Sequence, residues 1–226
     1  MLVGGAGKRM QSLSKKRPKA LMPIGDITFL DMLIGRLEKF QIDDVILSLH
    51  YKAELFFNHL KKTNYSNFVT SIIEPKPFGT GGAIKYVIDK RSISNPFFAL
   101  NGDTITETNF DLMKTVFDNS SFDAMIGISY VNNTERYGTV QFEGNNIEKF
   151  IEKGRVSSGW INNGHYVMKK NIFDSFSGNF SLEYDVFPQL AEENKLGVFP
   201  VQGDNFIDMG IPKDYEKLCK MYTVLD

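Results

Sequence analysis

Three glycines and a run of cations near the start of the chain have the residue types that bind an anion. Gly4, Gly5 and Gly7 follow a short apolar run. Six cations come within twelve positions after them: Lys8, Arg9, Lys15, Lys16, Arg17 and Lys19. A glycine lacks Cβ, so its backbone N–H group can approach an anion closely, and neighbouring cations add positive charge. The segment therefore predicts a polyphosphate-binding loop, a flexible turn beside solvated charges being the alternative.

Two other kinds of phosphate-binding loop do not fit this segment. A P-loop requires Ser or Thr after its Gly-Lys pair, and a glycine at fixed upstream spacing. Here Arg9 follows Lys8, and the upstream glycine is absent. The dinucleotide pattern G-x-G-x-x-G requires a glycine at position 10, which is Met10. A P-loop kinase is therefore disfavoured.

Two aspartates each follow a short apolar run that is typical of a strand. Asp103 ends the stretch F-F-A-L-N-G-D, and Asp208 lies in N-F-I-D-M-G-I-P. Ligands of open α/β sheets bind beyond the carboxyl ends of strands, where the glycine loop also lies. Carboxylates beside a polyphosphate indicate a divalent metal, because like charges would otherwise repel. We therefore expect Asp103 and Asp208 to share one Mg²⁺, with a cap after the strand as the alternative for Asp103.

A second glycine-rich turn, in residues 74–85, opens a predicted helix. Gly79, Gly81 and Gly82 would let a flat ring lie against the backbone, whose N–H and C=O groups could read the edge of a base. An ordinary turn before a helix is the alternative.

The second half of the chain carries polar residues that could hold an acceptor molecule. Lys153, next to Glu152, could bind an acceptor phosphate, but a solvent-facing pair fits equally well. The amides of residues 162–164 could meet hydroxyl groups or could belong to a β-bulge. Glu183 lies in the first turn of a predicted helix, where its charge would complement the helix dipole.

Composition limits the class of protein. Of 226 residues, 42% are hydrophobic and 23% charged, as in an ordinary globular protein, and the net charge is −1. Bulk attraction to nucleic acid or to an anionic membrane is therefore not expected. We see no apolar run near the roughly 18 residues of a membrane helix and no secretory signal. The single cysteine, Cys219, is expected to be a packing residue in a cytoplasmic protein.

Strands and helices alternate along the first half. Strands are predicted at 1–3, 45–49, 68–73 and 96–100, and helices at 28–40, 53–62 and 81–90. This rhythm predicts an α/β fold, Rossmann-like and doubly wound, with a mostly parallel sheet and helices on both faces.

The second half reads as a small β-rich insertion. Strands are predicted at 124–131, 160–168, 198–201 and 205–208, a hairpin at 138–142 and 147–151, and helices at 182–193 and 213–222. Ser181 is the expected N-cap of the first helix, and Pro188 should kink or divide it. We expect one domain over 1–226, with 1–120 mainly binding nucleotide and 121–226 mainly binding sugar phosphate.

Taken together, these motifs resemble those of the sugar-1-phosphate nucleotidyltransferases over nearly the whole chain. Members typically open with G-G-x-G-x-R-L and a downstream P-K-x-x-x-P, which read here as residues 4–10 and 18–23. Lys8 stands where many members have Thr, and Met10 where many have Leu; neither change removes a needed charge. The stretches F-G-T-G-G-A-I-K and R-Y-G-T-V are most similar to D-glycero-D-manno-heptose 1-phosphate guanylyltransferases, followed by mannose-1-phosphate guanylyltransferases.

The resemblance implies a fold of the nucleotide-diphospho-sugar transferase type and a Mg²⁺-dependent reaction. An NTP, with GTP expected, would condense with a sugar 1-phosphate to give NDP-sugar and pyrophosphate for surface polysaccharide synthesis. The sugar would be D-glycero-D-manno-heptose or mannose. A monomer or homodimer without nucleic-acid or membrane partners is expected. The alternatives are the same reaction with CTP, dTTP or UTP, and an inactive homologue that binds nucleotide or sugar nucleotide as a sensor.

The resemblance also implies roles for individual residues. Arg9, Lys19 and Asp103 would be catalytic, and Asp103 and Asp208 would hold the metal. The nucleotide would be bound by Leu2, Gly4, Gly5, Gly7, Lys8, Arg9, Glu74, Gly79, Thr80, Gly81, Asn101 and Gly102. The sugar phosphate would be bound by Tyr137, Gly138, Glu152, Lys153, Asn163, Gly164 and Glu183.

Overall fold

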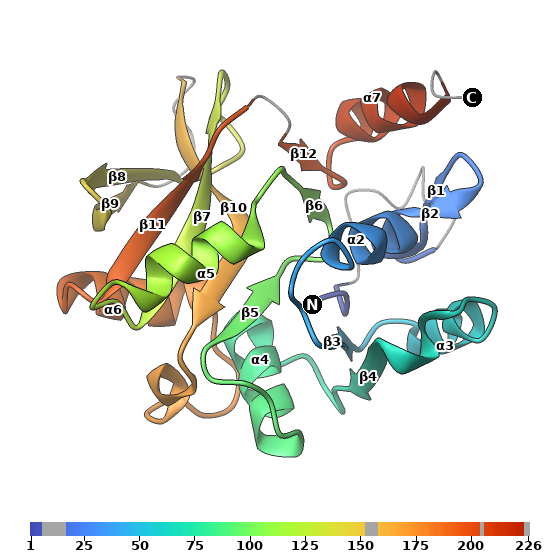
Figure 1. Cartoon of the computed structure of the whole chain (residues 1–226), viewed down its shortest axis with the longest axis horizontal. Helices are drawn as coiled ribbons and strands as arrows, with labels where there is room; N and C mark the ends of the chain where they lie inside the picture. The colour runs from blue at the N-terminus through green and yellow to red at the C-terminus, as the bar shows by residue number, and fades with distance from the viewer. Residues whose placement is uncertain (6–16, 152–157, 204–205, 224–226) are drawn as a thin grey trace. The chain divides into compact units, whose positions relative to one another are not determined.

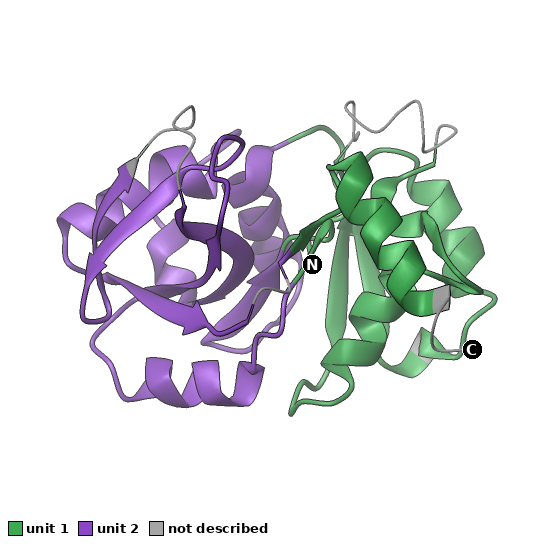
Figure 2. Ribbon diagram, turned by 90° about the horizontal axis from the view of Figure 1, so that it is seen from above, with its two compact units in different colours: residues 1–77, 101–105, 207–226 green, residues 78–100, 106–206 purple. Residues whose placement is uncertain are grey.

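The chain crosses repeatedly between two structural units. The structure, a computed structural model, describes residues 1–5, 17–151, 158–203 and 206–223. One unit comprises Met1–Pro77, Asn101–Ile105 and Ile207–Asp226, and the other comprises Phe78–Leu100 and Thr106–Phe206 (Figure 2). The units are thus interleaved in sequence.

Parallel backbone pairing organises the first unit. Strand β3 (Val45–Leu49) pairs in parallel with β4 (Val69–Ile73) (Figure 1). Leu2 forms parallel bridges to both Ser48 and Asn101, so the predicted short first strand is present as a single bridging residue. Helices α2 (Phe29–Leu37) and α3 (Ala53–Leu60) follow the predicted alternation.

Short elements complete this unit around an apolar core. They are η2 (Lys19–Leu21), β1 (Pro23–Ile24), β2 (Ile27–Thr28), η3 (Tyr65–Asn67), β6 (Thr104–Ile105), β12 (Ile207–Asp208) and α7 (Pro212–Thr223). Phe29, Met209 and Leu218 are among the buried residues of the core, which joins α2, β12 and α7. Strands β6 and β12 pair antiparallel with Thr104 opposite Asp208, so the core fixes the place where two predicted site segments meet.

A six-stranded sheet forms the second unit. Its order is β5 (Phe97–Leu100), β10 (Gly159–Met168), β7 (Ala124–Val131), β11 (Leu196–Val201), β9 (Asn146–Ile151) and β8 (Thr139–Glu143). Only β7 and β11 run parallel among these neighbours in the described part of the chain. The α/β class is therefore confirmed, but a mostly parallel sheet is not. A tight turn between β8 and β9, with Gly144 at φ 58°, requires antiparallel strands.

Helices cover both faces of this sheet. Helix α5 (Phe110–Asp118), drawn in front of the sheet in Figure 1, packs Met113 and Phe117 against Val167 of β10. The neighbouring Tyr166 contacts Phe187 of α6 (Phe187–Glu192) with ring centroids 5.2 Å apart. Because adjacent strand residues point to opposite faces, the two helices lie on opposite sides.

The remaining helices agree with most of the predicted boundaries. Helix α4 spans Gly79–Lys90, and η4 spans Lys170–Phe173. Predicted helix 182–193 is divided into a π-helical turn, η5 (Leu182–Val186), and α6, with Ser181 capping the former and Pro188 in the first turn of the latter. Helix α5 was not predicted, although Asn109 is an N-cap signal and accepts from the Leu112 N–H group.

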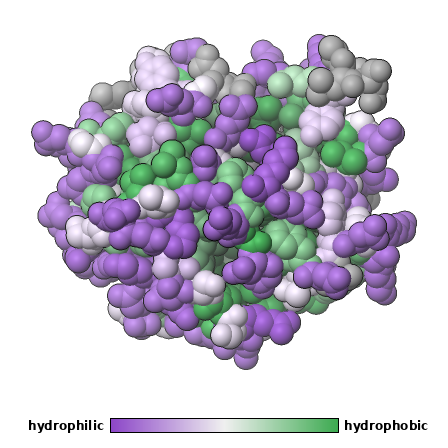
Figure 3. Space-filling view, viewed as in Figure 1, coloured by the Kyte–Doolittle hydropathy of each residue, from purple (hydrophilic) through white to green (hydrophobic). Residues whose placement is uncertain are grey.

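Polar side chains cover most of the face drawn in Figure 3, with small apolar areas between them. Exposed large apolar residues in the described chain are scattered over several elements; Leu112, Ile73 and Tyr184 are examples. None of the described helices has the length and apolar character needed to cross a membrane.

Candidate active site

An ion pair joins two residues that were predicted to be catalytic. Lys19 is the first residue of η2, and Asp103 directly precedes β6. The Lys19 Nζ group donates to Asp103 Oδ2 at 2.8 Å, and the side chains are 19% and 39% exposed. A charge-assisted hydrogen bond of this length orients the ammonium while leaving part of the carboxylate accessible.

Asp208 lies beside this pair. The Met209 N–H group donates to the Asp103 carbonyl at 2.8 Å, which joins the two aspartate segments directly. A Cβ atom added to Gly210 would lie 2.8 Å from Asp208 Oδ1 and 3.0 Å from Lys19 Nζ. Both charged atoms therefore converge on the space above Gly210, where only a residue without a side chain leaves room for them.

The donor set is suited to a metal ion shared with a phosphate substrate. The described residues contain no group of three or more His, Cys, Asp or Glu side chains that could hold a metal. Mg²⁺ usually takes only one or two protein carboxylates and completes its coordination with waters and substrate phosphates. Asp103 and Asp208 supply that number of carboxylates. Waters and the phosphates of the substrate would have to provide the remaining ligands.

Close backbone packing forms the strand ends beside these residues. The Gly102 N–H group donates to the Leu2 carbonyl at 2.9 Å, and a Cβ at position 102 would collide with Val3. A Cβ at Gly4 would lie 3.0 Å from the His50 backbone nitrogen. Both glycines thus allow neighbouring segments to approach each other. Gly5 has open space around it, and predicted residues Gly7, Lys8 and Arg9 lie outside the described residues.

Glu74 is a buried carboxylate at the end of β4. Its residue is 6% exposed, and its Oε1 atom accepts from the Ser48 hydroxyl at 2.8 Å. The Glu74 N–H group donates to the Leu49 carbonyl at 2.7 Å, and the Glu74 carbonyl lies 3.1 Å from His50 Nδ1. These contacts fix the carboxylate at the carboxyl edge of the parallel strands; its role toward a nucleotide stays a prediction.

The glycine-rich turn at the start of α4 packs against another part of its own unit. A Cβ at Gly81 would collide with the Phe180 ring, and one at Gly82 would lie 2.6 Å from the Gly178 carbonyl. The N–H groups of Gly81 and Gly82 donate to the Phe180 carbonyl at 3.1 and 3.2 Å. Gly79 has φ +77°, which favours glycine. Close protein packing thus explains these glycines, and reading of a base edge by this turn stays a prediction.

Thr80 and Glu183, predicted to bind different substrates, share one hydrogen-bond network. Glu183 Oε2 accepts from the Thr80 hydroxyl at 2.7 Å and from the Ser181 hydroxyl at 2.6 Å. The Leu182 N–H group donates to Thr80 Oγ1 at 2.9 Å. The network ties the start of α4 to the start of η5, where the Glu183 charge complements the first turn as expected.

A β-bulge accounts for the geometry of residues 162–164. The register of β10 against β7 shifts between Asn162 and Tyr166, and Gly164 has φ +85°. Asn163 is 0% exposed; its amide donates to Ser129 Oγ at 3.2 Å and accepts from the His165 N–H group at 3.1 Å. The register shift agrees with the alternative of a bulge, and the Asn163 amide is directed into the protein. Binding of the acceptor by Asn163 and Gly164 stays a prediction.

For the other residues predicted to bind the sugar phosphate, the structure gives few contacts. The Tyr137 ring packs edge-to-face on Phe206 with centroids 5.5 Å apart, and Gly138 follows just before β8. Glu152 and Lys153 lie outside the described residues, so their roles stay predictions.

Sequence reasoning did not single out Asp214, which lies in the first turn of α7 and contacts Asp208. Its Oδ2 atom accepts from the Asp208 N–H group at 3.1 Å. The available signal was an aspartate soon after Pro212, where acidic residues favour the start of a helix.

Comparisons with known proteins agree with the geometry. Residues 1–223 match the family described as Nucleotidyl transferase. The chain is 38% identical over 224 residues to D-glycero-alpha-D-manno-heptose 1-phosphate guanylyltransferase of Aneurinibacillus thermoaerophilus, covering 97% of this chain and 96% of that protein. It is 33% identical over 216 residues to the same enzyme of Campylobacter jejuni, covering 95% of each.

A solved structure is also similar over nearly the full length. The crystal structure of HddC from Yersinia pseudotuberculosis complexed with GMP-PN has a TM-score of 0.83 and 34% identity. The match covers 98% of this chain and 97% of that one. From the family match and these full-length similarities, we conclude that the chain belongs to the nucleotidyl transferase family.

Proposed function

We propose that the protein condenses GTP with a sugar 1-phosphate to give a GDP-sugar and pyrophosphate. The convergence of Lys19 Nζ and Asp208 on Gly210, with Asp103 bonded to Lys19, carries this proposal, because it places an ammonium near two carboxylates suited to a metal–phosphate complex. The two heptose 1-phosphate guanylyltransferases, matched over nearly their whole length, favour D-glycero-α-D-manno-heptose 1-phosphate as the acceptor. Mannose 1-phosphate is the second choice, because a 28% identical relative in Sulfolobus acidocaldarius bears the name "Putative mannose-1-phosphate guanyltransferase".

The reaction requires positioning rather than a general base. An oxygen of the sugar phosphate attacks the α-phosphorus of GTP in line, forming a new P–O bond while the bond to the β-phosphate oxygen breaks. The attacking phosphate is already anionic, so no proton has to be removed. Lys19, oriented by Asp103, would neutralise charge that develops on the α-phosphate.

Asp103 and Asp208 would hold Mg²⁺, which when bound supplies positive charge to the phosphates. The expected roles of the remaining residues complete the site: residues 4–7 and Arg9 bind the β- and γ-phosphates, and Lys153 binds the sugar phosphate. We expect the protein to act in the cytoplasm as a monomer or homodimer, with NTP and sugar 1-phosphate as its only partners.

A panel of substrates tests the proposal. Pyrophosphate release would be measured with GTP, CTP, dTTP and UTP, each combined with heptose, mannose and glucose 1-phosphates and Mg²⁺. The expected result is the highest kcat/KM for GTP with the heptose. Binding of nucleotide by calorimetry without turnover for any pair would instead support an inactive homologue, and Asp103→Asn supplies the inactive reference.

A further inference from the structure

We propose that Asp214 is a positioning residue, which holds the backbone of Asp208 so that its carboxylate lies beside the Lys19–Asp103 pair. The inference rests on the proposed function of that site and assigns to Asp214 a task that does not require contact with any substrate.

Asp214 closes a short loop between β12 and α7. Its Oδ2 atom accepts from the Asp208 N–H group at 3.1 Å. Two further bonds tighten the loop: the Ile211 N–H group donates to the Asp208 carbonyl at 2.9 Å, and the Asp214 N–H group donates to the Ile211 carbonyl at 3.1 Å. Asp208 is thus held at both its N–H and its C=O group.

The Asp208 side chain is held from the other direction. The Gly210 N–H group donates to Asp208 Oδ1 at 2.6 Å, and the Met209 N–H group donates to the Asp103 carbonyl at 2.8 Å. The loop therefore determines where the Asp208 carboxylate lies relative to Asp103. A shift of the Asp208 backbone would move this carboxylate away from the Lys19 ammonium.

Asp214 itself lies on a fixed support. It occupies the first turn of α7, where its charge is favourable. The adjacent Tyr215 donates its hydroxyl to the Pro23 carbonyl at 2.9 Å, which anchors α7 to β1. Burial, followed by the neighbouring Cys219 thiol, raises the pKa of Tyr215 to about 12, so the hydroxyl stays a donor over the range in which the enzyme would work.

The hydrogen bond to a backbone N–H group distinguishes positioning from direct metal binding. An asparagine at position 214 keeps an oxygen acceptor but has no charge, whereas an alanine has neither. If Asp214 positions Asp208, asparagine should substitute for it. If the carboxylate bound the metal itself, asparagine and alanine should both be defective.

Metal affinity and kinetics of Asp214→Ala and Asp214→Asn test the proposal. Mn²⁺ binding to the whole protein would be measured by the loss of the free-ion EPR signal. The half-saturating Mg²⁺ concentration and kcat would be measured from pyrophosphate release. Since one hydrogen bond is lost, we expect Asp214→Ala to raise the Kd for Mn²⁺ and the half-saturating Mg²⁺ concentration about five- to tenfold each, and to lower kcat. Asp214→Asn should stay within about threefold of the unsubstituted protein, by the same hydrogen-bond argument.

Glu216→Ala is the matched control, because Glu216 is an exposed acidic residue on the same helix. The proposal is overturned if Asp214→Ala changes only the unfolding midpoint, or if asparagine is as defective as alanine in Mn²⁺ binding. If the unsubstituted protein shows no turnover, the proposed function fails separately, while the Mn²⁺ measurement still tests the role of Asp214.

Discussion

Lys19 and Asp103 are 84 positions apart in the chain, yet Lys19 Nζ lies 2.8 Å from Asp103 Oδ2. The pair forms because η2 and the segment before β6 belong to the same unit, and Met22 and Ile105, which follow them in the chain, share its core. Asp208 joins them through the β6–β12 pairing. The arrangement places one positive and two negative groups where an anionic substrate and a metal ion can be accommodated together.

Replacing Lys19 by methionine should abolish most activity without unfolding the protein. Lys19→Met keeps the length of the side chain but removes a preorganised charge, so kcat should fall at least about a hundredfold. Asp103→Asn should cause a loss of similar size by the same argument. Steady-state pyrophosphate release measures both. Lys114→Met is the control, since Lys114 forms an exposed ion pair with Asp118 on α5; an equal loss there, or near-normal rates at position 19, would contradict the site assignment.

Gly210→Ala should impair catalysis more than folding. The added Cβ meets the Asp208 carboxylate and the flexible end of Lys19, which can move away at little cost to stability. Because displacement by about 1 Å can cost up to about a hundredfold in rate, we expect kcat to fall about ten- to hundredfold. Kinetics and the thermal unfolding midpoint should be measured together.

Gly35→Ala is the control for Gly210→Ala. Gly35 lies inside α2 and has open space around it, so alanine should raise the free energy of unfolding by about 0.5–1 kcal/mol and leave kcat unchanged. A normal kcat for Gly210→Ala would show that the space above Gly210 is not needed for the reaction.

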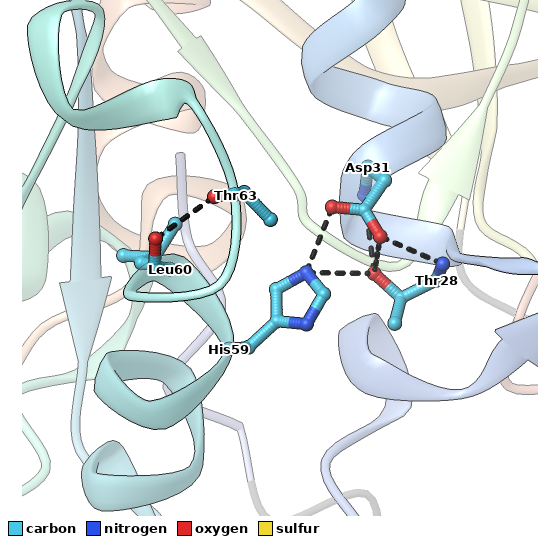
Figure 4. Close-up of polar contacts among 5 residues, drawn as sticks. All are labelled: Thr28, Asp31, His59, Leu60 and Thr63. Atoms are coloured by element: carbon cyan, nitrogen blue, oxygen red, sulfur yellow. Dashed lines mark hydrogen bonds and ion pairs between the residues drawn. The ribbon is translucent and has the colours of Figure 1, made fainter.

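Asp31 should make stability depend on pH in the acid range. Its carboxylate accepts from the N–H and hydroxyl groups of Thr28 at 2.8 and 2.7 Å, and His59 Nε2 of α3 lies 2.7 Å away (Figure 4). Burial alone would raise the pKa of Asp31, but the bonds from Thr28 and His59 outweigh it and lower the pKa below the ordinary 3.8. The resulting stability is present above that value and is lost as the pH falls through the lowered pKa.

Asp31→Asn should therefore lower the free energy of unfolding at pH 7 by about 1 kcal/mol, as for loss of a helix cap. The difference from the unsubstituted protein should shrink as the pH falls from 3.8 through the lowered pKa of Asp31, because the carboxylate becomes protonated over that range. Urea unfolding at several pH values measures this. Asp89→Asn, in an exposed pair with Lys85, should show little change at any pH. An undiminished difference at low pH would contradict the account.

Asn163→Ala should affect stability rather than acceptor binding. The substitution removes the hydrogen bonds to Ser129 and the His165 N–H group inside the sheet, so unfolding should become easier by about 1–3 kcal/mol. KM for the sugar 1-phosphate should stay within about threefold, since a loss of roughly 0.7 kcal/mol or less corresponds to no direct contact. A large rise in KM without loss of stability would show that Asn163 contacts the acceptor, as its motif first indicated.

Local signals explain what could be predicted from the sequence. Helical spacing of apolar residues predicted α2, and apolar runs predicted β3 and β7, which are buried at nearly every position. Pairing between distant strands has no such signal, so the antiparallel position of β10 between β5 and β7 was not predicted. The glycine motifs showed where the backbone must approach something closely, but not that the partner of Gly81 is Phe180.

For the candidate site, the sequence predicted the charged residues but not the contact that holds Asp208. Asp103 and Asp208 were identified because each follows a predicted strand, at the edge where open α/β sheets bind ligands. Lys19 was identified from the P-K-x-x-x-P motif of the family that the sequence resembles. Asp214 was not, because its contact is with a backbone N–H group, and any polar residue in the right fold could make it.

The fate of labelled phosphate tests the central claim, nucleotidyl transfer, most directly. The protein would be incubated with Mg²⁺, heptose 1-phosphate and GTP labelled at either the α- or the γ-phosphate, and the products separated by chromatography. We predict that the α-label appears in the GDP-sugar and the γ-label in pyrophosphate. The two products should form with the same time course, because both come from the same cleavage of GTP. Transfer of the γ-label to the sugar phosphate, or no sugar nucleotide with any NTP, would contradict the account.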